Sequence, residues 1–284
     1  MTFPAPIAHG PAPARWLYRV ALPVSLVLWL LPIIGVALTS VRSAADLAQG
    51  NLWGIPTEWQ LLENYRDVFE RTPMGRYLLN SLLVAVPTVI GAVALSCLAG
   101  YALAIHRFKL NLLVFFMFVG GNFVPFQILT VPVREFSLRL GLYNTMTGLV
   151  LFHIAFQSGF CTFFMRNFIR QLPREVIEAA RMEGANDWQI FRYVVIPLVR
   201  PAIAALSVLI FTFIWNDYFW ATVLIQGDQA MPVTGGLYSL NGQWIAQWHL
   251  VSAGSIVAAL PPVAIFFLMQ RHFIAGLTLG ASKG

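Results

Sequence analysis

The chain has 284 residues, of which 58% are hydrophobic and only 11% are charged, and its formal net charge is +6. A soluble domain carries about a quarter charged residues. With a mean hydropathy of +0.71, this composition therefore excludes an ordinary soluble enzyme and predicts an integral membrane protein. The two cysteines, Cys97 and Cys161, both lie in apolar runs, so no disulfide framework is predicted.

The first 14 residues are rich in Pro and Ala, and we expect them to be disordered. Six apolar runs follow, and they predict helices because a backbone in lipid must satisfy its own hydrogen bonds. Each is long enough to cross a hydrocarbon core of about 30 Å. The first is too long for a signal peptide, so we expect it to be retained. The runs are residues 16–41, 77–105, 112–132, 145–165, 201–225 and 249–270.

The basic residues predict the orientation of these spans. Twelve of the 18 Lys and Arg residues lie in the N-terminal stretch, in residues 106–111 and 166–200, and after Gln270. Because cytoplasmic loops carry the excess of Lys and Arg, these segments and both termini are predicted to be cytoplasmic. The positive charge is thus a topology signal rather than a nucleic-acid footprint. We expect residues 43–76 outside, with a short helix near residues 64–70, and residues 226–248 outside as a shaped loop rather than a helix.

Residues 166–200 predict a cytoplasmic helix-turn-helix. Pro173 suits the first turn of a helix, which runs to about Glu183, and Gly184 permits the turn that ends it. Asn186 or Asp187 can cap a second helix, which Pro197 ends or kinks. One face of that second helix is apolar, with Ile190, Phe191, Val194 and Val195.

The first helix of this segment has a surface suited to a partner. Ala179 and Ala180 are small enough to let the helix sit deep in a groove, and Glu178 offers an oriented contact. On the residues alone, a plain amphipathic helix lying on the membrane surface remains an open alternative.

Several fixed positions here match at fixed spacing. Glu178-Ala179-Ala180, then Gly184, then a hydrophobic ending with Ile196-Pro197, resembles the EAA motif of ABC importer permeases; the usual Leu before the proline is Ile196 here. Further stretches from residue 16 to 284 look like the carbohydrate-uptake branch of that family: Asn80-Ser81, Gly100-Tyr101-Ala102, residues 141–145, Trp215-Asn216-Asp217 and residues 276–284.

The resemblance is to the second, six-span permease of a maltose-type system. It implies an all-α fold of the type I ABC importer class, with residues 15–284 as one permease domain in the bacterial cytoplasmic membrane. It also implies a heterodimer with a second permease, two ATPase subunits, an external solute-binding protein and a sugar substrate.

The same resemblance assigns expected roles to residues. ATPase coupling falls to the motif residues Glu178, Ala179, Ala180, Gly184, Ile196 and Pro197. A C-terminal tail with Gly280, Lys283 and Gly284 would reach between the ATPases. The external loop would meet the binding protein through Pro232, Gly235, Gly236, Leu237 and Tyr238.

Asp217 is the one acid within a predicted span, and intramembrane acids usually face a polar cavity or a partner. Trp215 and Tyr218 can stack on sugar faces, and Asn216 and Asp217 can bond hydroxyls, so these four residues are candidates for the substrate path or a gate. Because sugar contacts in the related maltose system lie largely on the other permease, a structural or gating role is favoured for Asp217.

Other chemistries find little support in the sequence. It contains no GxxxxGK[ST] phosphate loop, so we expect ATP and Mg²⁺ to bind partner subunits, with no cofactor in this chain. The histidines show no metal spacing. His153 lies within a span, where a core residue with satisfied hydrogen bonds is favoured over a relay residue. No catalytic triad is visible, which predicts a non-catalytic subunit. Two alternatives remain: a secondary transporter driven by an ion gradient, which would want more intramembrane charges or matched halves, and a membrane scaffold that transports nothing.

Overall fold

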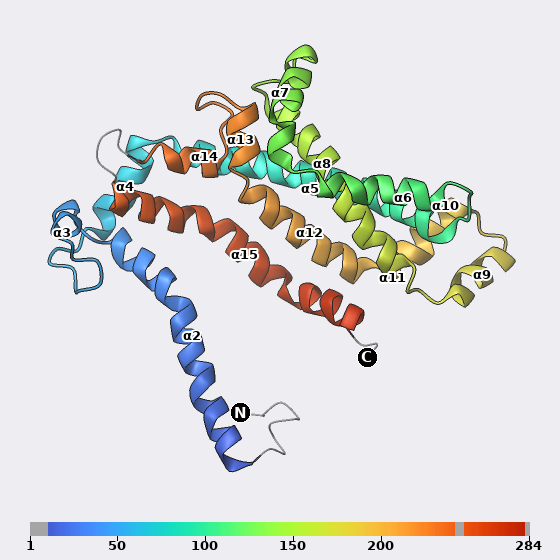
Figure 1. The fold of residues 1–284 in the computed structure, drawn as a ribbon, viewed down its shortest axis with the longest axis horizontal. Helices are drawn as coiled ribbons and strands as arrows, with labels where there is room; N and C mark the ends of the chain where they lie inside the picture. Colours follow the sequence, from blue (N-terminus) through green and yellow to red (C-terminus); the bar gives the residue numbers. More distant parts are fainter. Residues whose placement is uncertain (1–10, 242–246, 282–284) are drawn as a thin grey trace. The chain divides into compact units, whose positions relative to one another are not determined.

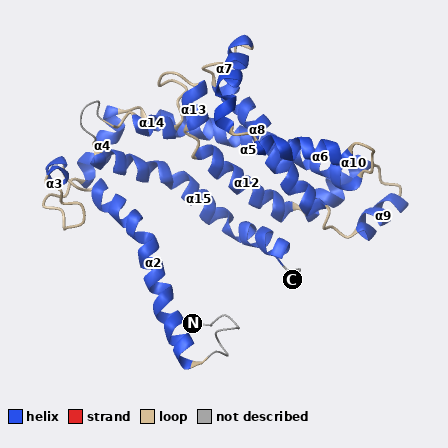
Figure 2. Ribbon diagram, in the orientation of Figure 1, coloured by secondary structure: helices blue, strands red, loops and turns tan. Residues whose placement is uncertain are grey.

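The computed structural model describes residues 11–241 and 247–281, with side-chain surroundings up to Gln270, and all regular structure in that part is helical (Figure 1, Figure 2). In chain order the elements are α2 (Ala12–Ser40), α3 (Ala44–Ala48), α4 (Leu61–Arg71), α5 (Met74–Ile105), α6 (Asn111–Gly120), the 3₁₀ turns η1 (Gly121–Phe123) and η2 (Phe126–Leu129), α7 (Thr130–Arg139), α8 (Met146–Ile169), α9 (Arg174–Met182), α10 (Asp187–Gln189), the π-helix η3 (Ile190–Val195), α11 (Ile196–Leu198), α12 (Arg200–Trp215), α13 (Phe219–Leu224), α14 (Val233–Tyr238) and α15 (Trp248–Ala281).

Four of the described helices are long and apolar enough to cross a membrane: α2, α5, α8 and residues Trp248–Gln270 of α15. The number rises to six if each of two bent helix pairs forms one span. One bent pair lies in the third predicted run, and the other joins residues Asp187–Leu198 to α12. The six predicted apolar runs are mainly helical, but the third and the fifth are not continuous helices.

The expectation of a continuous third helix over residues 112–132 is wrong. The helix that starts at Asn111 stops after Phe123, resumes at Phe126, and the two pieces differ in direction by 91°. Pro125 causes the break because it has no amide hydrogen for the Gly121 carbonyl, which accepts from the Val124 N–H instead at 3.4 Å. Val124, as the residue before a proline, is extended, with ψ of 121°.

The expectation of a continuous fifth helix over residues 201–225 is also wrong. Helix α12 ends at Trp215, and α13 begins only at Phe219. The Asp217 carboxylate accepts hydrogen bonds from the backbone N–H groups of Trp220 and Ala221, at 3.3 and 3.0 Å. An acid that bonds the backbone of the residues after it favours a new helix start over a continuing helix.

The chain forms two compact units. One contains residues 1–72 and 240–257, and the other contains residues 73–239 and 258–284. In the first unit, the predicted short helix near residues 64–70 is confirmed as α4. Its Asn64 donates to the carbonyls of Ser40 and Arg42, at 3.0 and 2.8 Å, which fastens α4 to the end of α2. Helix α2 begins at Ala12, inside the stretch expected to be disordered, because Pro13 fits the first helical turn.

The second unit is built around α5 and α8, which pack along their lengths (Figure 1). Gly100 allows the close approach, since a Cβ there would lie 2.9 Å from the Arg166 backbone nitrogen. Cys97 and Cys161 are free, buried thiols, as expected. His153 is buried in α8, as expected, but the expectation that its hydrogen bonds are satisfied is wrong, because neither ring nitrogen has a hydrogen-bond partner among the described residues.

Two further expectations need correction. Residues 226–248 are not helix-free, because Val233–Tyr238 form α14 directly after Pro232. The C-terminal stretch does not begin as a separate tail, because α15 continues as a helix to Ala281 and includes Gly280. Lys283 and Gly284 lie outside the described residues.

Candidate functional site

The helix-turn-helix predicted at residues 166–200 is present between Arg174 and Leu198, and its local signals act as expected. Helix α9 follows Pro173, and Gly184 has a φ of +86° just after its end. The N–H of Gly184 bonds the Arg181 carbonyl and the N–H of Ala185 bonds the Ala180 carbonyl, both at 3.0 Å. This is the double hydrogen bond of a Schellman turn, which satisfies the last carbonyls of the helix.

Asn186, rather than Asp187, caps the second helix. Its side chain accepts from the Gln189 N–H at 2.9 Å, and the Gln189 side chain accepts from the Asn186 N–H at 2.8 Å. This reciprocal pair is a capping box. The helix then widens into the π-helix η3, and the direction changes by 74° at Val199 before α12. The bend therefore falls two residues after Pro197.

The apolar side of this segment seats it on the end of α5. Ile177, Ile190, Phe191 and Val195 are buried, and Val194 is half-buried. The Tyr101 hydroxyl donates to the Asp187 carbonyl at 3.3 Å, and the Tyr101 and Phe191 rings lie 5.3 Å apart. The helix-turn-helix is thus a packed part of the second unit, which leaves its other side free.

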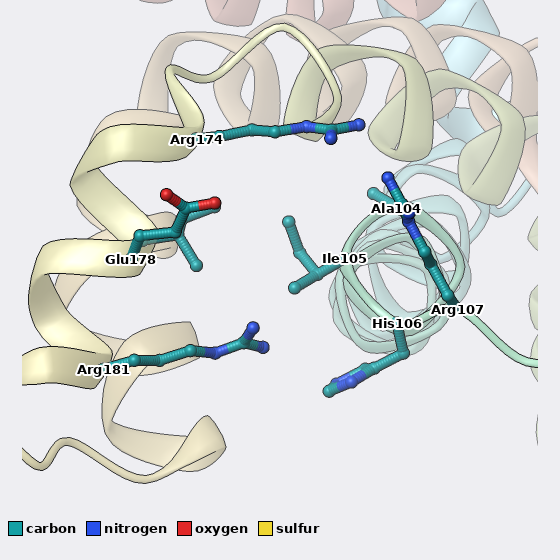
Figure 3. A pocket seen from close by; sticks show the side chains of 8 residues that line it. Ala104, Ile105, His106, Arg107, Arg174, Glu178 and Arg181 are labelled. Atoms are coloured by element: carbon teal, nitrogen blue, oxygen red, sulfur yellow. The ribbon is translucent and has the colours of Figure 1, made fainter.

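A polar pocket of about 480 Å³ separates α9 from the end of α5 (Figure 3). Arg174, Glu178 and Arg181 extend into it from α9, and His106 and Arg107 extend into it from the opposite side (Figure 3). Arg181 also contacts the Asp187 carboxylate at 3.4 Å. Sequence reasoning used these arginines only for topology, since their meeting depends on the packing of α9 against α5.

The predicted coupling residues differ in how exposed they are. Glu178 and Ala179 are exposed and Ala180 is half-buried. Ile196 is half-buried and Pro197 is exposed in α11. Glu178 lines the pocket, whereas Ala179 does not. The motif residues therefore lie on one short segment but not all on one surface.

The predicted substrate-path residues mostly bond to the protein itself. The Trp215 indole N–H donates to the Ala258 carbonyl at 3.0 Å, and Asn216 donates to the Thr212 carbonyl at 2.8 Å. Asp217 caps α13 and lies 3.4 Å from His153 Nε2, with its side chain 16% exposed. Asn216 and Tyr218 are exposed, whereas Trp215 is buried and Asp217 is half-buried.

The predicted docking loop is held on the start of α5. Asn80 donates to the carbonyls of Gln229 and Met231, at 2.9 and 3.0 Å, and Ser81 accepts from the Val233 N–H at 2.8 Å. The Tyr77 ring covers Gly236, where a Cβ would lie 2.1 Å from the ring. Asn80 and Ser81 therefore hold the predicted docking loop on α5.

Within this loop the predicted docking residues differ in access. Pro232 and Gly236 are buried, Gly235 and Leu237 are half-buried, and the Tyr238 side chain is 66% exposed. Among the described residues, Tyr238 is thus the predicted contact that a partner can reach most easily.

A match between this sequence and the model of a known protein family decides to which family the chain belongs. The family described as the binding-protein-dependent transport system inner membrane component matches residues 77–278. The chain belongs to this family. It is therefore an inner-membrane transport component, and the predicted fold and permease class are confirmed.

Relatives of this permease share most of its length. A probable ABC transporter permease protein of Pyrococcus horikoshii is 36% identical, with 88% of this chain and 91% of the relative covered. An osmoprotective compounds uptake permease protein of Synechocystis sp. is 35% identical, with 90% and 88% covered. An arabinooligosaccharides transport system permease protein of Halalkalibacterium halodurans is 30% identical, with 95% and 96% covered.

A solved structure agrees on the fold. A chain of a bacterial ABC transporter involved in the import of the acidic polysaccharide alginate superposes with a TM-score of 0.79 at 24% identity, over 93% of this permease and 99% of that chain. No group of three or more potential metal ligands occurs among the described residues of this permease.

Proposed function

We propose that this permease is one half of the translocation pore of an ATP-driven, binding-protein-dependent importer of sugars. The observation that carries the proposal is the packed helix-turn-helix, whose motif residues match the EAA pattern and whose free side offers small side chains and Glu178. The family's description includes a binding protein, and the Halalkalibacterium relative is a permease for arabino-oligosaccharides.

The proposed partners are two ATPase subunits and a second permease. The sequence has no phosphate loop, so the ATP-binding subunits are separate chains, and this permease is a non-catalytic subunit with no cofactor of its own. A second permease completes the pore. The C-terminal residues, including Gly280, Lys283 and Gly284, approach the ATPase pair.

ATP closes the ATPase pair, and the helix-turn-helix transmits that movement to the spans. The link is short, because Tyr101 at the end of α5 bonds Asp187 of the second helix directly. In physical terms, the spans have two packed arrangements, and ATP and the loaded binding protein shift the balance between them.

Reconstitution tests this function against an ion-driven transporter. The permease, with its second permease, ATPases and binding protein, is placed in proteoliposomes with labelled arabino-oligosaccharides and α-glucosides outside. We expect uptake that requires internal ATP and the binding protein. Uptake that needs neither but follows an imposed proton or sodium gradient would identify a secondary transporter instead. Assembly without uptake of any solute would favour a scaffold.

The docking loop has its own test. Cysteine in place of Tyr238 is expected to crosslink to the binding protein, because that side chain is exposed on a loop held firmly by Asn80 and Ser81. The matched control is cysteine at Leu62, which is exposed on α4. Crosslinking at Leu62 but not at Tyr238 or Ser239 would place the docking site outside the loop.

A further inference from the structure

The break in the third span lies beside a groove of about 300 Å³ between α6 and α8. The residues that line it include Phe118, Asn122, Phe156 and Ser158. Sequence reasoning placed no functional residue here, because the break itself was not predicted.

The groove lies near the middle of the membrane. Helix α6 packs on α8, with the Phe115 and Phe163 rings 6.1 Å apart and the Phe118 carbonyl next to Gly159. Gly159 is the fourteenth of the 24 residues of α8. At about 1.5 Å rise per residue, it lies close to the midpoint of a helix long enough to span the membrane.

A break at this depth cannot face lipid. Irregular backbone within the hydrocarbon region is tolerated only where it is buried in protein or lines a water-filled cavity. In this chain Asn122, Phe123 and Val124 are all exposed. In secondary transporters, substrate sites also lie at discontinuous helices near the midplane. The exposed side of the break is therefore suited to face an aqueous path.

The groove offers one clear hydrogen-bond acceptor. Asn122 Nδ2 donates to the carbonyls of Phe118 and Val119, at 3.1 and 3.3 Å, which fixes the amide in place. No donor among the described residues bonds its Oδ1 atom. A solute hydroxyl can therefore donate to that oxygen.

Gly159 makes this arrangement possible. A Cβ at this position would lie 2.4 Å from the Phe118 carbonyl oxygen and 2.7 Å from Asn122 Nδ2. Only glycine allows Asn122 to lie this close to α8. Together with the two phenylalanine rings, the amide forms a surface with apolar faces and a fixed acceptor, which matches the C–H face and the hydroxyl edge of a sugar ring.

We propose that the groove formed by Phe118, Asn122, Phe156, Ser158 and Gly159 is a sugar-binding subsite on the translocation path. The proposal rests on the proposed function for the class of solute. Asn122 Oδ1 accepts from a sugar hydroxyl, and Phe118 and Phe156 contact the apolar face of the ring. The site is separate from Asp217, which is occupied with α13 and His153.

Cysteine labelling in the complete transporter tests the site. Asn122→Cys is exposed to a membrane-impermeant, charged methanethiosulfonate, and the labelling rate is measured. Wild type gives the background, because Cys97 and Cys161 are both buried. The matched control is Leu113→Cys, which is exposed on α6 but does not line the groove. Co-purification of all subunits shows that each variant assembles.

We expect Asn122→Cys to react and Leu113→Cys to remain at background. A transported arabino-oligosaccharide or α-glucoside, added with the binding protein and ATP, is expected to slow the labelling of the Asn122→Cys variant severalfold. Asn122→Leu is expected to change the ranking of competing sugars, with a loss of about fivefold for the best one, as for one lost hydrogen bond.

Two results would overturn the subsite. One is an unreactive Asn122→Cys in an assembled transporter, which would place the groove against lipid or the second permease. The other is reaction without protection by a sugar that wild type transports. If wild type transports none of these sugars, the proposed sugar specificity fails, and protection is then tested with osmoprotective solutes, where its absence also overturns the binding role.

Discussion

Gly184→Leu is expected to lower transport by about tenfold or more while the protein still inserts into the membrane. The reason is the backbone, because Gly184 has a φ of +86° and no atom lies within 4 Å of where its Cβ would be. A side chain in the left-handed region costs about 1–2 kcal/mol, and a cost of about 1.4 kcal/mol changes an equilibrium tenfold. The Schellman turn would open, and α9 would lose its fixed direction against the ATPase.

Two control variants at Gly184 separate the energetic cost of a left-handed backbone from the effect of a larger side chain. Gly184→Asn is expected to retain most activity, because Asn tolerates this region well, whereas Gly184→Ala should behave like a milder Gly184→Leu. ATP hydrolysis stimulated by the loaded binding protein and sugar uptake are the two measurements. Normal uptake and normal stimulation in an assembled Gly184→Leu transporter would remove α9 from the coupling path.

Asp217→Ala is expected to reduce the amount and thermal stability of the assembled transporter without changing which sugar competes best. The change removes the cap of α13, which costs about 0.5–2 kcal/mol. It also removes the carboxylate that lies 3.4 Å from Nε2 of buried His153, whose ring makes no hydrogen bond among the described residues. Asp217→Asn keeps an acceptor oxygen and should be milder.

The pair with His153 gives this prediction its control. If the two side chains support each other, Asp217→Ala combined with His153→Leu should cost less than the sum of the single variants. Melting of the purified transporter and sugar competition are measured together. A changed order of sugar preference, with unchanged melting, would assign Asp217 to substrate contact.

Local sequence signals were sufficient for the helix-turn-helix. Pro173, Gly184 and Asn186 each act through their own backbone or through residues up to three positions away, so their effect is readable without the fold. The long apolar runs of α5 and α8 were equally readable, since hydrophobicity over about 20 residues decides a span.

The broken spans were harder to predict, because hydrophobicity does not report continuity. The third run is apolar on both sides of Val124-Pro125, and only the proline and the preceding Gly120-Gly121 pair indicated a stop. In the fifth run, Asn216 and Asp217 were interpreted as possible sugar contacts. Their tendency to start a new helix was the better indication.

Contacts between distant segments could not be predicted at all. The pocket brings residues of α9 together with residues at the end of α5, and nearby in the chain Phe191 packs on Tyr101. Helix α14 lies within a glycine-containing loop, where the Val233 N–H bonds Ser81 and Gly236 packs against the Tyr77 ring. Neither pairing has a local signature in a single sequence.

The two broken spans touch each other beyond their breaks. The rings of Phe126, in η2, and Phe219, in α13, lie 5.0 Å apart in an edge-to-face arrangement. The same helix α13 is also fixed on α8, because the Trp220 and Phe152 rings lie 4.2 Å apart. A rotation of η2 about the first break must therefore either move α13 with it or separate the Phe126 and Phe219 rings. The two breaks are thus mechanically coupled, and α8 resists the movement of both.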